Sequence, residues 1–287
     1  KHATPATVSR AGILYISDDS GYQRSCYVAS WLNSLRDKFK INPDSLTKIF
    51  DKYFEKGISY LQKHCKPLIP VSYLSVTVSL CKMLESIIRK EMPNLQVFVN
   101  EKPTDNLDPI KLEYLFNMCA VWALGGALAE KEKRDYRKDF STFWKNEFKG
   151  VKFPGKGTVF DYYVSMVDGK VSFEEWKSRI DNVEYEPGTA MQNITVPIPE
   201  TVSIQQLSKY LITIGAPVLF IGGAGCGKTQ LIKGLLKDIR TSMPDLYYYT
   251  TINFNYYTDS TYLQNMMENE LVKQGNRFGP KKGGKIK

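Results

Sequence analysis

One stretch of the sequence has the residue types and the spacing to bind phosphate. Gly222, Gly227, Lys228 and Thr229 meet the pattern G-x-x-x-x-G-K-[ST]. Such glycines let the backbone aim several N–H groups at one point, the lysine can reach the β- and γ-phosphates, and the threonine hydroxyl can hold Mg²⁺. The loop that we expect to bind ATP or ADP consists of Gly222, Gly223, Ala224, Gly225, Cys226, Gly227, Lys228 and Thr229.

The sequence on either side of this loop supports the motif, which is short enough to occur by chance. Residues 217–222, PVLFIG, form an apolar run of strand length, and residues 228–239 have the pattern of an amphipathic helix. The start of that helix adds the positive end of its dipole to the loop. Cys226 contributes its backbone amide and need not be reactive. We therefore expect a strand, the loop and a helix in succession.

Hydrolysis needs a further element. A P-loop ATPase also uses a second strand, which ends in Asp or Asp-Glu, to hold Mg²⁺ and polarise water. Residues 246–255, LYYYTTINFN, predict a strand without a carboxylate pair at its end, and residues 258–274 predict a capped helix. The sequence stops at Lys287, where we expect the acidic strand to begin. We therefore expect the chain to be a piece of a longer enzyme, inactive by itself.

The positive charge of the chain does not by itself indicate a nucleic-acid partner. Lysine and arginine exceed the acids by 39 − 30 = 9. Cations alternate with acids in residues 130–139, EKEKRDYRKD, which is typical of a solvated helix face. Five cations lie in a Gly-rich segment near the end that predicts a loop: Arg277, Lys281, Lys282, Lys285 and Lys287. The sequence has no ordered strip of arginines and aromatic residues. A lysine-rich surface is therefore favoured over a nucleic-acid site.

The remaining composition argues against a metal site and a membrane span. The five cysteines stand singly and only two histidines are present, so a zinc site is not expected. An odd, unclustered set of cysteines favours reduced, mostly buried thiols in an intracellular protein. No apolar run approaches the roughly 18 residues that a membrane span needs.

The residues before the loop predict mainly helices. An apolar run at 11–17 predicts a buried strand, and Gly125-Gly126 would let another backbone approach or would kink a helix. Aromatic residues at helical spacing are interpreted as core rather than as a cofactor site. Helices are expected over 22–40, from Asn42-Pro43-Asp44 onward, and over 71–91, 108–131 and 136–149.

The pattern changes after about residue 150. Alternating β-branched and aromatic residues on both sides of Asp168-Gly169-Lys170 predict a hairpin. Prolines and glycines in 184–200 predict a linker, and residues 201–214 predict a helix that leads into a new domain.

Four segments, in the same order, resemble a dynein heavy chain. They are ATPATVSRAGILYI (3–16), KGTVFDYYV (156–164), NITVPIPETV (193–202) and PVLFIGGAGCGKT (217–229). The resemblance implies an α/β fold class with a large helical part, in which an AAA+ helical lid subdomain is followed by the start of a P-loop α/β core.

The resemblance also implies domain boundaries. Residues 1–20 correspond to the end of the large subdomain of a second AAA+ module, and residues 21–150 to the helical lid subdomain of that module. Residues 151–200 are a hairpin and linker. Residues 201–287 begin the third AAA+ large subdomain and carry its P-loop.

Single residues receive roles from the same resemblance. Arg10 stands where AAA+ modules place an arginine finger, which can neutralise charge that develops on the γ-phosphate in a neighbouring module. The alternative for Arg10 is a structural salt bridge at the start of a strand. Members of the family often have Pro and Thr where this loop has Gly223 and Cys226. These two differences from the family pattern keep the backbone amides that bind phosphate. Whether the site hydrolyses its nucleotide stays an open question.

The resemblance implies a regulatory ATP/ADP site, with Mg²⁺, in a microtubule-based motor ATPase. The implied partners are neighbouring AAA+ modules of the same heavy chain, microtubules bound through a stalk outside this chain, and dynein intermediate and light chains. Nucleic acid and membranes are not among them. The segment GTVFDYYV resembles axonemal dyneins more than the cytoplasmic one. The implied location is therefore the axoneme of a cilium or flagellum, within the cytoskeleton and cytoplasm.

Two other classes of function stay open. One is a basic, nucleic-acid-associated P-loop NTPase such as a helicase loader. The other is a structural scaffold whose nucleotide site never hydrolyses. An apolar strand that ends in Asp-Asp or Asp-Glu beyond Lys287 would favour the motor over the scaffold.

Overall fold

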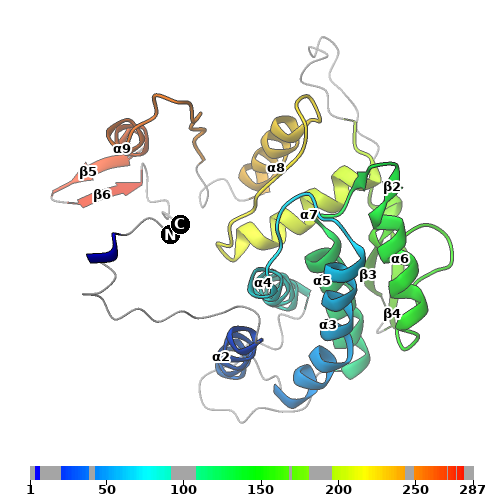
Figure 1. Cartoon of the computed structure of the whole chain (residues 1–287). Helices are drawn as coiled ribbons and strands as arrows, with labels where there is room; N and C mark the ends of the chain where they lie inside the picture. Colours follow the sequence, from blue (N-terminus) through cyan, green and yellow to red (C-terminus); the bar gives the residue numbers. More distant parts are fainter. Residues whose placement is uncertain are drawn as a thin grey trace. The chain divides into compact units, whose positions relative to one another are not determined.

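A computed structural model describes most of the chain in two compact units, Lys1–Glu175 and Trp176–Lys287 (Figure 1). None of the helices in the described part of the chain combines the length and the apolar character of a membrane span. The described residues are 4–6, 21–38, 43–91, 108–167, 170–180, 196–242, 249–269, 271–275 and 277–280.

The first unit is mainly helical, as the apolar periodicity predicts (Figure 1). Its long helices are α2 (Tyr22–Lys38), α3 (Pro43–His64), α4 (Tyr73–Glu91), α5 (Pro109–Gly125) and α6 (Tyr136–Glu147). Helix α5 packs against both α3 and α4 and is buried along most of its length. Asp108 caps it by accepting from Ile110 N, and Pro109 takes the first helical position, where its missing N–H costs nothing.

The core of this unit is aromatic where α3, α5 and α6 meet. Phe50 and Phe116 lie edge to face, with ring centroids 4.8 Å apart. Trp144 is fully buried, and its Nε1 donates to Asn117 Oδ1 at 3.2 Å. A Cβ on Gly57 would lie 2.7 Å from Leu124 Cδ1. Helix α3 can therefore approach α5 and α6 this closely only because residue 57 has no side chain.

Helix α5 is shorter than the predicted helix over 108–131, because it ends at Gly125. A Cβ on Gly125 would lie 2.5 Å from Phe160 Cζ, so this glycine makes room for an aromatic ring rather than for another backbone. Strands β1 (Glu130–Lys131) and β2 (Arg134–Asp135) follow and pair antiparallel.

The interpretation of 130–139 as one solvated helix face is wrong for its first half. The turn residues Glu132 and Lys133 have φ of 55° and 66°, the left-handed conformation of a tight hairpin turn. Helix α6 begins only after Asp135, whose side chain caps it by accepting from Arg137 N and Lys138 N.

The predicted hairpin is confirmed. Strands β3 (Tyr162–Val167) and β4 (Lys170–Glu175) pair antiparallel, and Val164 lies opposite Phe173. Residues 168 and 169 of the turn lie outside the described residues. Strand β3 packs against α5, and Val164 N donates to the sulfur of Met118 at 3.4 Å.

The second unit contains the predicted helices on both sides of the glycine loop. They are α7 (Pro199–Thr213) and α8 (Lys228–Ser242), which pack against each other. Leu207 of α7 and Leu235 of α8 are buried, and Lys209 Nζ lies 2.6 Å from Asp238 Oδ2. A short 3-10 helix, η3 (Trp176–Arg179), also packs against α7.

Two predicted strands are absent from the described residues of this unit. Residues 217–222 and 249–255 have no strand pairing, and Leu219 is 79% exposed. Described strands occur only as antiparallel pairs of neighbours in sequence. A strand of a parallel sheet forms when others flank it and helices cover its faces, so an apolar run without such partners does not form one.

The predicted helix over 258–274 is also too long. Helix α9 (Ser260–Glu268) has the expected cap, because Asp259 Oδ1 accepts from Tyr262 N at 2.7 Å. Strands β5 (Leu271–Gln274) and β6 (Arg277–Pro280) then pair antiparallel, with Gly275 at φ +61° between them. A segment predicted as helix end and loop is therefore a hairpin.

Candidate functional site

The glycine loop turns into α8 through two residues in a conformation that favours glycine. Gly225 and Gly227 have φ of +75° and +83°, in the left-handed region. Helix α8 then begins at Lys228, and Leu231 N donates to Gly227 O at 2.9 Å. The first N–H groups of a helix have no acceptor within the helix, so they point their partial positive charge toward the loop.

The side chain of Lys228 folds back over this loop. Its Nζ donates to Gly222 O at 2.8 Å and to Gly223 O at 2.6 Å. Cys226 Sγ is a third acceptor, at 3.4 Å. The ammonium therefore lies within the loop, beside the N-terminus of α8.

The donors of the loop fit a phosphate group. A Cβ on Gly222 would lie 2.9 Å from Cys226 Sγ, so a side chain there would require the Cys226 side chain to move. A Cβ on Gly223, Gly225 or Gly227 would meet nothing within 4 Å. Donor N–H groups, an ammonium and the adjacent Thr229 hydroxyl form a set that can hold phosphate oxygens. Residues 222–229 contain no carboxylate. They can therefore bind phosphate, but they cannot polarise a water molecule for hydrolysis.

The structure therefore describes every predicted loop residue, from Gly222 to Thr229, and brings them together at the start of one helix. The predicted finger, Arg10, and the predicted strand over 11–17 lie outside the described residues.

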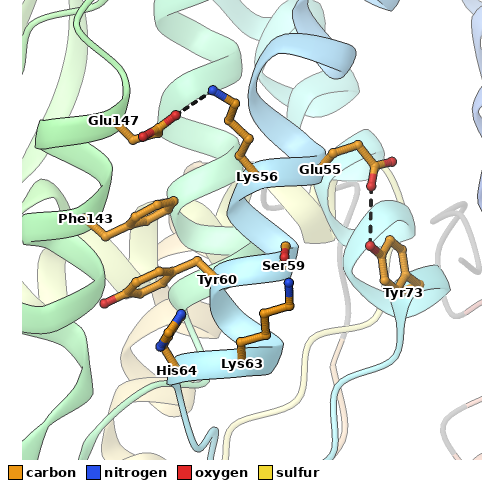
Figure 2. A pocket seen from close by; sticks show the side chains of 9 residues that line it. All are labelled: Glu55, Lys56, Ser59, Tyr60, Lys63, His64, Tyr73, Phe143 and Glu147. Atoms are coloured by element: carbon orange, nitrogen blue, oxygen red, sulfur yellow. Dashed lines mark hydrogen bonds and ion pairs between the residues drawn. The ribbon is translucent and has the colours of Figure 1, made fainter.

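A hollow of about 610 Å³, which no sequence pattern indicates, lies beside α3 in the first unit (Figure 2). Figure 2 shows Tyr60 and Phe143 side by side in its lining, and their rings stack with centroids 3.9 Å apart. Its lining residues are Glu55, Lys56, Ser59, Tyr60, Lys63, His64, Tyr73, Phe143 and Glu147.

The carboxylates of this hollow already have partners. Glu147 Oε1 lies 2.5 Å from Lys56 Nζ. Glu55 pairs with Arg24 and accepts from Tyr73 Oη. Partly exposed ion pairs of this kind orient side chains and do not by themselves indicate a catalytic group. The described residues also contain no group of His, Cys, Asp and Glu that could hold a metal ion.

The cysteines are all free, and three of them are buried. Burial raises the pKa of the Cys65 thiol to about 11 and raises the pKa of Cys81 and Cys119 as well. Thiols with raised pKa values are poor nucleophiles, so these three are structural. Cys26 and Cys226 are exposed.

Comparisons with known proteins identify both units. A family model described as "Dynein heavy chain AAA lid domain" matches residues 46–178, and "P-loop containing dynein motor region" matches residues 183–287. The chain is 36% identical to "Dynein axonemal heavy chain 9" of Homo sapiens over 280 residues, which are 97% of this chain and 6% of that protein. It is 34% identical to "Dynein alpha chain, flagellar outer arm" of Chlamydomonas reinhardtii over 292 residues, 98% of this chain and 6% of that protein.

A third relative agrees with these two. The chain is 36% identical over 284 residues to "Dynein beta chain, ciliary" of Heliocidaris crassispina, again 98% of this chain and 6% of that protein. The chain thus spans about 6% of the length of the curated relatives that it matches. With the helical lid in its first unit and the phosphate-type loop in its second, the chain belongs to the dynein heavy chain family.

Proposed function

We propose that residues 222–229 bind ATP or ADP within a microtubule-based, ATP-driven motor of cilia or flagella. One observation carries the nucleotide site: Lys228 opens α8 and places its ammonium inside a glycine loop, at the positive end of the helix. The family supports the motor, and the names of the relatives support the axoneme.

Each part of the loop has a task in this proposal. The amides at the start of α8 and Lys228 hold the β- and γ-phosphates, and the Thr229 hydroxyl holds Mg²⁺. When bound, the metal ion would neutralise charge on the phosphates. Because residues 222–229 contain no carboxylate, hydrolysis requires an acidic strand from elsewhere in the heavy chain. The 287-residue chain should therefore bind nucleotide without turning it over.

We further propose that the loop belongs to the third AAA+ module and regulates the motor. Gly223 and Cys226 depart from the Pro and Thr common in the family, which suits a site that holds nucleotide more than one that turns it over. Arg10 would serve as an arginine finger for a neighbouring module. The proposed partners are the other modules of the heavy chain, microtubules through a stalk outside this chain, and intermediate and light chains.

The nucleotide site is tested by titrating the purified chain with a fluorescent ADP analogue. Replacing Lys228→Ala removes a charged donor to the phosphates and should weaken binding by roughly tenfold to a hundredfold. Lys233→Ala is the matched control, because Lys233 is an exposed lysine of the same helix outside the loop. Equal affinities of the two variants would reduce the loop to a structural turn.

The regulatory role needs the complete heavy chain. Lys228→Ala should empty the site and reduce the velocity at which the motor moves microtubules. A variant with an empty site and the velocity of the unaltered motor would show that the loop only holds nucleotide as a structural element.

A further inference from the structure

All three N–H groups of the Lys228 ammonium have acceptors in the loop. Two of the acceptors are the main-chain oxygens of Gly222 and Gly223, at 2.8 and 2.6 Å. The third is the sulfur of Cys226, at 3.4 Å. A lysine ammonium has three donors and no more. A phosphate oxygen can therefore gain a hydrogen bond from Lys228 only by displacing one of these three acceptors.

The three acceptors differ in strength. The two carbonyl oxygens are good acceptors at short distances, and the winding of the loop fixes their positions. A thiol sulfur is a weak acceptor. The Cys226 contact is therefore the one that a phosphate oxygen displaces most easily, while the two carbonyls keep the lysine in place.

The sulfur lies inside the curve of the loop rather than outside it. A Cβ built on Gly222 would approach Cys226 Sγ to 2.9 Å, and its next neighbours would be Lys228 Cδ and Nζ at 3.9 and 4.0 Å. Sγ, the ammonium and the Cα of Gly222 thus form one compact group. The Cys226 side chain therefore lies against the ammonium that we expect to contact phosphate.

We propose that Cys226 tunes the affinity of this loop for phosphate, because its side chain occupies the donor of Lys228 that a phosphate oxygen must take. The inference rests on the proposed nucleotide site and adds a positioning residue to it. A stronger acceptor at residue 226 competes better for the ammonium and weakens binding. A side chain without an acceptor at residue 226 leaves this N–H of Lys228 bound to water. Phosphate replaces water readily, so binding becomes tighter.

Two substitutions at residue 226 test this inference in opposite directions. With pyrophosphate as the probe, Cys226→Ser should weaken binding about fivefold and Cys226→Ala should strengthen it about twofold, since one hydrogen bond from a charged donor changes in strength. ADP should give the same order of affinities. Adenosine, which has no phosphate, should bind all three proteins alike. Cys26→Ser is the control, because Cys26 is an exposed cysteine of the first unit.

The outcomes separate this inference from the proposed function. Equal affinities of the Ala and Ser variants for pyrophosphate, or tighter binding by the Ser variant, would overturn the role of Cys226 and leave the nucleotide site intact. If neither the unaltered chain nor Lys228→Ala binds ADP or pyrophosphate, the proposed site fails and this inference fails with it. Unchanged melting temperatures ensure that the comparison concerns folded proteins.

Discussion

Gly57 tests how closely the helices of the lid pack. In Gly57→Ala the new Cβ would lie 2.7 Å from Leu124 Cδ1 and 2.9 Å from Trp144 Cζ3. Carbon atoms in ordinary contact are separated by about 3.5–4.0 Å. Trp144 is fully buried, and its indole is also held by the hydrogen bond to Asn117. Either Leu124 must change its rotamer or α3 must move away.

Two opposing effects set the size of the change. An extra methyl group in a well-packed core costs about 1–3 kcal/mol. Alanine is the better helix former, which returns up to about 1 kcal/mol. From the middle of the packing cost, about 2 kcal/mol, the net loss in the free energy of unfolding should be about 1–2 kcal/mol. For a domain of 150–250 residues, each kcal/mol lowers the melting temperature by about 2–4 °C.

Thermal unfolding followed by circular dichroism measures this loss. Gly234→Ala in α8 is the matched control, because its Cβ would meet only the end of the flexible Gln205 side chain, at 3.2 Å. That variant should be as stable as the unaltered chain or more stable. A Gly57→Ala protein that melts at or above the temperature of the unaltered chain would refute the close approach of α3.

Three further predictions concern hydrogen bonds, pH and the proposed arginine finger. Asn117→Leu should reduce the free energy of unfolding by about 1–3 kcal/mol, because Trp144 Nε1 would stay buried without an acceptor; unchanged stability in urea would contradict this. Burial alone raises the pKa of Glu113, but its hydrogen bonds from Lys52 and Tyr53 outweigh burial and lower that pKa below the usual 4.5. The stability that the ionised Glu113 contributes should be fully present above the usual pKa and should be lost as the pH falls through the lowered pKa. Urea unfolding at several pH values measures this loss of stability. The loss should be absent in Glu113→Gln. In the complete heavy chain, Arg10→Ala should slow ATP turnover at the first module by a factor on the order of 10³ without weakening nucleotide affinity; unchanged microtubule-stimulated turnover would leave Arg10 a structural role.

Most of the described helices could be predicted from the sequence, because their apolar residues face a core made within the same unit. Helix α9 is an exception, since none of its residues is buried. The errors came where a local alternative competes with the helix. Residues 130–135 have good helix formers, yet Glu132 and Lys133 adopt the left-handed conformation and close a hairpin. Residues 217–222 show the opposite error: their composition is that of a strand, but a strand needs neighbours that no local pattern supplies.

The glycine loop at the start of α8 could be predicted because its motif is local and contiguous. The position of the Lys228 ammonium on Gly222 O and Gly223 O could not, since it depends on how the loop closes. The hollow beside α3 was missed for another reason. Its residues come from separate helices, and each looks like part of a solvated surface until Tyr60 and Phe143 are seen stacked.

The exposed apolar side chains of the second unit bear on how such a chain is made in a cell. Leu219, Phe254 and Tyr256 are 79%, 70% and 94% exposed. Uncovered apolar residues in β-prone segments are sites of aggregation during synthesis and refolding. During translation these segments leave the ribosome well after the lid, whose core is already complete. We expect chaperones to bind these segments during synthesis. The recombinant yield should therefore depend on temperature and on the supply of chaperones more than on the stability of the lid.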